Sequence, residues 1–168
     1  MVYPESGKTA YSRVEVDIVI KSDYFTGRSK KQTPMQEIIR ISTNKQNGLF
    51  DITREVEAIV ANSRITQGTA SVYVQGATAA MMIQESWDQS VQNDVVALMK
   101  KLIPHGVWEH DAQDNNGDAH LKAGLIGPGE TIPIIDGRLG LSTWQNIFVC
   151  EFDGPRHTRN IVVTLTEA

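Results

Sequence analysis

Cysteine is nearly absent from this chain, since Cys150 is the single cysteine among 168 residues. No internal disulfide can form, so an apolar core must stabilise the fold. Cys150 lies in the apolar stretch "NIFVCEF", which contains no cationic residue that would lower the pKa of its thiol. We therefore predict a buried, unreactive side chain at this position.

Long hydrophobic runs are also missing. No segment approaches the roughly eighteen apolar residues of a membrane span. The N-terminal residues show no charged region followed by an apolar region, as a signal peptide would. We therefore predict a cytoplasmic protein that has no membrane partner.

The chain has no excess of positive charge. Sixteen Lys and Arg residues face twenty Asp and Glu residues, and the net charge is −4. This balance argues against a broad nucleic-acid-binding surface. One basic cluster, Arg28, Lys30 and Lys31, has no interleaved aromatic residue, and we interpret it as a solvated loop. The length and the hydrophobic fraction of 40% indicate one domain over residues 1–168, in which 1–12 form an N-terminal tail.

Apolar periodicity predicts several strands and two helices. Alternating or short apolar runs predict strands at 13–20, 36–43, 69–74, 80–85, 120–126, 131–136, 143–152 and 160–166. One helix is expected to begin near Asp51 and bury Ile52, Val56, Ile59 and Val60. A second is expected to begin at Asp88, to bury Val91, Val95, Leu98, Met99 and Leu102, and to end before Pro104.

The order of these elements predicts the fold class. The strands fall mostly into hairpin-like pairs, of which 143–152 and 160–166 form the last. The helices are inserted between pairs. We predict an α+β fold, a single compact domain with a largely antiparallel or mixed sheet and two main helices packed on one face.

The segment "WEHDAQDNNGDAH" (108–120) is rich in metal ligands and proton carriers. Imidazoles of His110 and His120 and carboxylates of Asp111, Asp114 and Asp118 suit a divalent metal. Asp118 and His120 would point to the same face of a strand, so both could reach one ion. The competing interpretation is an ordinary polar turn, because Asp, Asn and Gly favour turns.

Other candidates carry weaker signals. Arg156, His157 and Arg159 could bind a phosphate or carboxylate, or lie in a solvated hairpin loop. Glu85 ends an apolar strand, where it could be a general base or a structural carboxylate. Trp144 is expected in the core. The sequence contains no GxSxG or HExxH motif and no phosphate-binding loop.

Three segments resemble one known family. They are "GTASVYVQGATAAMMIQE", "EHDAQDNNGDAHLKAGLIGPGETIPIIDGRLGLSTWQNIFVCEFD" and "RNIVVTLTE". They are similar to the YjbQ-like family, also called UPF0047, from about residue 67 to the C-terminus. The resemblance implies a compact α+β homotrimer. It also implies a secondary thiamine-phosphate synthase-type reaction, in which a thiazole phosphate displaces pyrophosphate from a pyrimidine pyrophosphate.

The resemblance also implies site residues. The family's polar positions correspond here to His110, Asp111, Asn116, His120, Glu85, Trp144, Gln145, Glu151 and Arg159. Two positions depart from the family pattern. Gly76 and Asp118 each stand where many members have a histidine.

Three functional hypotheses follow. In the first, a transferase uses His110, Glu85 and Asp111 for catalysis and Asn116, Gln145, Arg156 and Arg159 for ligand binding. A divalent metal (zinc, magnesium or manganese) would lie on His110, His120 and Asp118. In the second, the same pocket of a trimer binds a metal or a small phosphorylated metabolite without turnover. In the third, the chain is a trimeric scaffold and the polar segment is only a turn.

Overall fold

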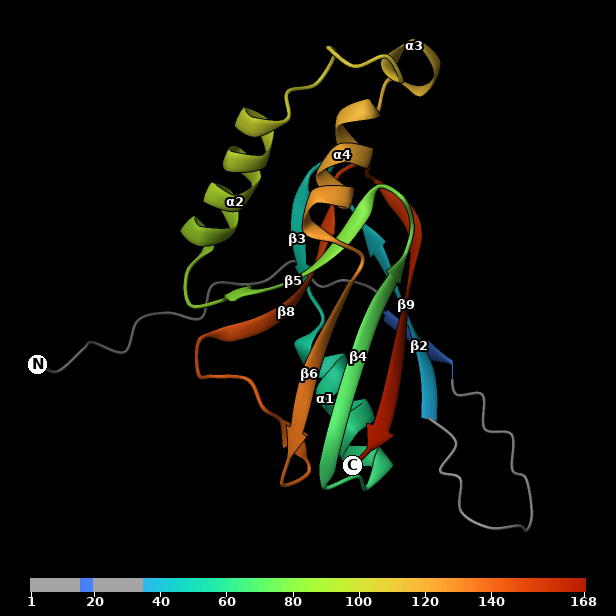
Figure 1. The fold of residues 1–168 in the computed structure, drawn as a ribbon, viewed down its shortest axis with the longest axis vertical. Helices are drawn as coiled ribbons and strands as arrows, with labels where there is room; N and C mark the ends of the chain where they lie inside the picture. The colour runs from blue at the N-terminus through green and yellow to red at the C-terminus, as the bar shows by residue number, and fades with distance from the viewer. Residues whose placement is uncertain (1–15, 20–34) are drawn as a thin grey trace, which may run out of the picture.

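The computed structural model describes residues 16–19 and 35–168, which form two antiparallel sheets and four helices. Figure 1 shows the larger sheet curling around the core, with α1 at one end and α2, α3 and α4 towards the other. The α+β class is confirmed. The expected tail at 1–12 and the basic cluster lie outside the described residues.

The larger sheet has six strands in the order β1-β2-β9-β4-β6-β7. Their bounds are β1 (Val16–Val19), β2 (Met35–Thr43), β9 (Arg156–Glu167), β4 (Gln67–Gln75), β6 (Gly129–Ile135) and β7 (Arg138–Leu139). The C-terminal strand β9 pairs with β2 on one side and with β4 on the other. Its alternate residues Ile161, Val163 and Leu165 are buried, as expected for a strand with one face on the core.

The smaller sheet has the order β3-β8-β5, with β3 (Gly48–Asp51), β8 (Gln145–Glu151) and β5 (Ala79–Glu85). Its central strand β8 is buried on both faces, which explains its continuous apolar run. Val149 faces the main core, while Cys150 faces a second cluster that includes α2 and α4 residues. Burial raises the pKa of the Cys150 thiol to about 12, so the expected buried cysteine is confirmed.

Helix α1 (Thr53–Ser63) follows the expected pattern, and Val56, Ile59 and Val60 are buried. The Oδ1 atom of Asp51 accepts hydrogen bonds from the backbone and the hydroxyl of Thr53, at 2.9 and 2.6 Å. Asp51 therefore supports the start of the helix, although Ile52 occupies the N-cap position.

Helix α2 (Gln89–Leu102) begins as expected, because Asp88 caps it by accepting a hydrogen bond from the backbone of Ser90 at 2.7 Å. The expected buried stripe is wrong in part. Met99 is buried, but Leu98 and Leu102 are 50% and 57% exposed, and Gln92 is buried instead. The helix rests on β3 and β5 along its Gln92–Met99 face, so the remaining apolar residues stay near solvent.

The predicted strand at 120–126 is wrong, because these residues lie in helix α4 (Gly117–Ile126), which follows the short helix α3 (Asp111–Asp114). A short apolar run does not by itself distinguish a strand from a helix. Here Ala119 and Ala123, one turn apart, pack against β5 and β8. Asn115 separates the two helices with a left-handed backbone (φ 54°), which asparagine tolerates.

The predicted final hairpin is also wrong. Strands β8 and β9 are consecutive in sequence but belong to different sheets, and so do β4 and β5. The chain changes sheets at Gly76–Thr78 and again after Glu151. A compact two-sheet core requires such crossings, which strand periodicity does not reveal. No helix in the described ranges is long and apolar enough to cross a membrane.

Candidate functional site

The polar segment at 108–120 forms α3 and the start of α4 at one end of the molecule (Figure 1). Asp111 holds this segment together. Its carboxylate accepts hydrogen bonds from the backbone of Trp108 and of Gly117, both at 2.8 Å. The bond from Trp108 is the main cause of the lowered pKa of Asp111. Both oxygens of this predicted catalytic residue therefore serve the local fold.

Asp118 lies at the centre of this end and contacts two basic side chains, His105 and Lys122. One oxygen is 3.0 Å from Nδ1 of His105, and the other accepts a hydrogen bond from Nζ of Lys122 at 2.5 Å. Asp118 and Lys122 are 5% and 1% exposed, whereas the side chain of His105 is 47% exposed. Burial raises the pKa of Asp118, but bonds and charges from Lys122 and His105 outweigh it and lower the pKa overall. Asp118 is therefore a carboxylate at neutral pH.

His105 and Lys122 were missed by sequence reasoning. Asp118 and Lys122 are four residues apart, a spacing that brings side chains together on a helix but not on the strand that was expected. A correct helix assignment would have found Lys122. Nothing in "LIPHGVW" marks His105, because it reaches Asp118 only through the turn after α2.

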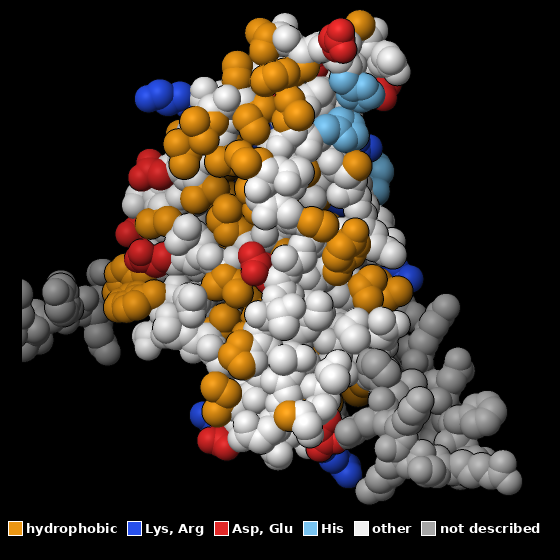
Figure 2. Space-filling view, viewed as in Figure 1, with side chains coloured by type: hydrophobic (Ala, Val, Ile, Leu, Met, Phe, Trp, Pro, Cys, Tyr) orange, Lys and Arg blue, Asp and Glu red, His pale blue; other side chains and the backbone are white. Residues whose placement is uncertain are grey.

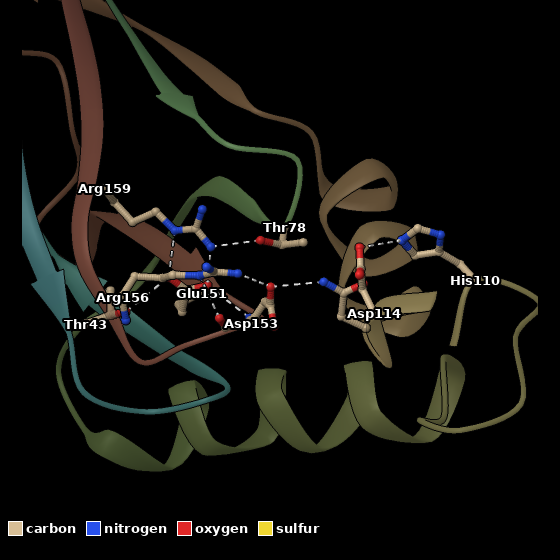
Figure 3. Close-up of polar contacts among 9 residues, drawn as sticks. Thr43, Thr78, His110, Asp114, Glu151, Asp153, Arg156 and Arg159 are labelled. Carbon is tan, nitrogen blue, oxygen red and sulfur yellow. Dashed lines mark hydrogen bonds and ion pairs between the residues drawn. The ribbon is translucent and has the colours of Figure 1, made fainter. Parts of the chain in front are cut away.

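His110 and His120 do meet, as the metal hypothesis required. Their rings lie edge to face, with centroids 4.9 Å apart. Asp114 Oδ2 is 3.9 Å from Nε2 of His110 (Figure 3). Asp118 is not with them, because residues two apart on a helix point about 200° away from each other. In the described part of the chain, no three His, Cys, Asp or Glu side chains are placed to hold a metal ion.

A buried ion pair lies beside this end of the molecule (Figure 3). Arg159 donates from Nε and Nη2 to the two oxygens of Glu151, at 2.8 and 2.6 Å, and from Nη2 to the hydroxyl of Thr78 at 2.8 Å. The hydroxyl of Thr43 donates to Glu151 at 3.1 Å. All four residues are buried. Arg159 therefore lies within the fold and not in the exposed loop that was one interpretation of its sequence.

Asp153 connects this ion pair to α4. Its backbone donates to Glu151 at 2.9 Å, and its carboxylate accepts bonds from Arg156 and, at 3.1 Å, from Nδ2 of Asn116. Figure 3 shows Asp153 between Arg156 and the α3–α4 segment. Three of the four predicted ligand-binding residues, Asn116, Arg156 and Arg159, thus lie in one region. The two arginines among them already form salt bridges, with Asp153 and Glu151.

Gly76 provides room for Arg159. A Cβ atom added at Gly76 would lie 2.6 Å from Nη1 of Arg159, closer than real Cβ contacts. The resemblance implied a histidine here in many members. In this chain the guanidinium occupies the space that any side chain at residue 76 would need. The position of Arg159 therefore depends on the glycine that stands here in place of the implied histidine.

Glu85 and Gln145 lie elsewhere. They are partners in the β5–β8 ladder, at the edge from which the chain enters α2. The 14 residues of α2, about 21 Å at 1.5 Å per residue, separate Glu85 from the α3 segment (Figure 1). Trp144, which was expected in the core, is 48% exposed and packs edge-on against Trp87 at 4.7 Å. The catalytic set His110, Glu85 and Asp111 therefore does not form one cluster.

Comparison with known proteins identifies the family. Residues 37–168 match the family described as UPF0047 protein YjbQ-like. The chain belongs to the UPF0047 family. A UPF0047 protein of Methanocaldococcus jannaschii is 42% identical over 117 residues, which cover 70% of this chain and 84% of that protein. YugU of Bacillus subtilis, also a UPF0047 protein, is 38% identical over 125 residues, covering 73% and 92%.

A solved UPF0047-type fold agrees with the structure. The crystal structure of a YbjQ-like protein from Sulfolobus solfataricus superposes with a TM-score of 0.78 at 36% identity. The match covers 81% of this chain and 99% of that protein. The expected family and fold are both confirmed.

The predicted thiamine-phosphate synthase-type activity is contradicted. The matched family and both relatives bear only the designation UPF0047, and the Sulfolobus protein is described as having unknown function. The structure supplies a physical reason. Arg156 and Arg159, which were to hold the phosphates, are paired with Asp153 and Glu151. They leave little positive charge to bind a diphosphate.

Gly76→Ala should destabilise this UPF0047 protein by about 1–3 kcal/mol, because the new Cβ displaces a guanidinium that is held by Glu151 and Thr78. Thermal unfolding of the two proteins measures the effect. The matched control is Gly124→Ala in α4, where an added Cβ meets nothing within 4 Å and helix propensity favours alanine by about 0.5–1 kcal/mol. If both substitutions raised the unfolding temperature, the prediction that Glu151 and Thr78 hold the Arg159 guanidinium against Gly76 would be wrong.

Proposed function

We propose that the α3–α4 end of the molecule binds a small molecule and exchanges a proton with it, and that His105 is the acid–base group. The observation that carries the proposal is the contact of Asp118 with Nδ1 of His105 at 3.0 Å. A carboxylate at Nδ1 orients the imidazole and leaves Nε2 available for proton transfer.

The burial of the three residues supports this role. Asp118 is buried and Lys122 is almost fully buried, so the position of the carboxylate is set from inside the fold. The side chain of His105 is about half exposed and can reach a ligand. An imidazole with one buried partner and one free nitrogen is a common arrangement in general acid–base catalysis.

An ester substrate without specific binding requirements can test the proton transfer. With p-nitrophenyl acetate, Nε2 of His105 would take a proton from water as the water oxygen bonds to the ester carbonyl carbon. The bond to p-nitrophenolate then breaks, p-nitrophenolate and acetic acid are released, the acid ionises to acetate, and the His105 imidazolium returns its proton to water. We expect His105→Gln and Asp118→Asn to lose most of the protein-dependent rate.

The control for this assay is His157→Gln, which changes an exposed histidine on β9. Its rate should equal that of the parent. Equal rates for the parent and His105→Gln, with both proteins folded by circular dichroism, would refute the role of His105.

Binding of a divalent metal is a second candidate function, supported by fewer contacts. The ring contact of His110 and His120 and the nearby Asp114 support a site for zinc or a similar ion. The originally expected set fits poorly, because both oxygens of Asp118 are engaged by His105 and Lys122. The proposed set is therefore His110, His120 and Asp114, in which Asp114 would turn towards the rings.

Elemental analysis after dialysis against zinc tests the metal proposal. We expect about one zinc per chain in the parent and none in His120→Ala, because two ligands rarely hold the ion alone. The control His157→Ala should keep the metal. A metal-free parent would refute the proposal, as would an undiminished content in His120→Ala.

Self-association, and a homotrimer in particular, is also part of the proposal. Figure 2 shows apolar side chains gathered over α2 and between α2 and α4. Leu98 and Leu102 of α2 and Leu121 and Leu125 of α4 are 44–62% exposed. Contiguous exposed apolar side chains are typical of protein interfaces.

A cytoplasmic location is also proposed, and it agrees with the unpaired Cys150.

Light scattering during gel filtration tests the assembly. The parent is expected at three times the chain mass, and the double variant Leu121→Lys, Leu125→Lys at the mass of one chain, because two charges would be buried in the interface. Ile135→Lys, at an equally exposed site on β6, should not change the mass. A monomeric parent would contradict the proposal.

A further inference from the structure

A polar hollow lies between α2 and β3. It has a volume of about 250 Å³ and is lined by Lys45, Asn47, Gly48, Leu49, Gln89, Gln92, Asn93 and Val96. These residues come from the turn before β3, from β3 itself and from the first half of α2, whose packing partners include β3. The hollow is thus enclosed by two elements that the core holds in place.

Gln92 is the unusual residue in this wall. It occupies the buried face of α2, seven residues before the buried Met99, where an apolar side chain would be expected. It is 5% exposed, and its Nε2 atom has no hydrogen-bond partner among the described residues. A buried donor without an acceptor loses its hydrogen bonds to water without replacing them, so such a group in a native fold calls for an explanation.

The neighbours of Gln92 show which partner it lacks. Its Oε1 atom accepts a hydrogen bond from Nε2 of Gln89 at 2.9 Å, so Nε2 is the free end of the Gln92 amide. On the opposite side, Oδ1 of Asn47 accepts a hydrogen bond from Lys122 at 3.4 Å. The amide nitrogen of Asn47 therefore stays available as a second donor.

The charge of the hollow is positive. Lys45 lines it and forms no salt bridge with any described residue, whereas Lys122, Arg156 and Arg159 are all paired with carboxylates. No Asp or Glu lines the hollow. One unpaired ammonium and several amide donors, with no competing carboxylate, favour a ligand that carries acceptor oxygens and negative charge.

We propose that the hollow between α2 and β3 binds a small carboxylate-bearing metabolite, whose carboxylate accepts hydrogen bonds from Gln92 and Lys45. The volume is below the roughly 300–1,000 Å³ of pockets for drug-sized ligands, which restricts the occupant to a small molecule. Asn47 provides a further donor. The hollow adjoins the His105 site through the hydrogen bond between Asn47 and Lys122, but its proposed ligand contacts, Gln92 and Lys45, take no part in the proton transfer.

Side-chain amide signals in NMR spectra of the ¹⁵N-labelled full chain test this site. The probes are acetate, succinate and glutamate, each compared with its neutral amide, namely acetamide, succinamide and glutamine. We expect at least one carboxylate to shift the Gln92 amide signal while its amide counterpart does not. No shift at Gln92 with any carboxylate would overturn the proposal, and so would equal shifts with the amides.

Two variants test the donors. Gln92→Glu keeps the shape of the side chain but replaces the donor with a negative charge, and it should abolish binding. Lys45→Gln, at an exposed position that the fold does not require, should weaken binding about tenfold or more. The matched control is Lys100→Gln, on the exposed side of α2, which should bind as the parent does. Unchanged affinity in Lys45→Gln would overturn the role of the ammonium group.

Discussion

The two sheets are joined by the buried pair of Glu151 and Arg159. Glu151 ends β8 in the smaller sheet, and Arg159 lies on β9 in the larger one. Thr43 from β2 and Thr78 from the turn before β5 complete the hydrogen bonds of the pair. A buried charge without its partner is strongly unfavourable, so the pair requires these four segments to meet in one arrangement. The need for glycine at residue 76 follows from this arrangement, because an added Cβ would lie 2.6 Å from Nη1 of Arg159.

The same principle organises the α3–α4 end. Three buried or half-buried cations, Lys122, Arg156 and Arg159, each have a carboxylate partner, and Asp153 connects two of these pairs. Their charges are used to hold segments together. The imidazoles of His105, His110 and His120 are at least partly exposed at this end, beside the exposed carboxylate of Asp114. These groups are the basis of the proposed proton transfer and metal ligation, and the paired cations disfavour tight binding of a diphosphate.

Membership of the UPF0047 family does not reveal the reaction, because a fold can host many functions and the site must be argued from its own residues. In this chain Asp118 stands where a family histidine was expected. Its two oxygens connect a buried lysine to an exposed histidine that lies just before the segment that resembles the family. In the proposed function, the Asp118 carboxylate orients His105 and is not a metal ligand.

Much of the fold was determined by the sequence alone. The apolar alternation of β2 and β9, the stripe of α1 and the Asp88 cap of α2 are local features, and local periodicity was sufficient to place them. The family motifs in the second half of the chain were equally local. The order of the expected elements predicted the α+β class, and the metal hypothesis placed His110 near His120, although the strand then expected at 120–126 was wrong.

Only the tertiary structure decided which strands share a sheet, that 117–126 is a helix, and that Asp118 turns inward. Each depends on partners that are distant in the chain: Ala119 and Ala123 pack on β5 and β8, and Asp118 meets His105 thirteen residues away. The free donor of Gln92 is likewise visible only once α2 is placed on β3. Contacts between distant segments produce no periodic pattern in the sequence. The proposed sites at His105 and Gln92 therefore became visible only in the packed structure.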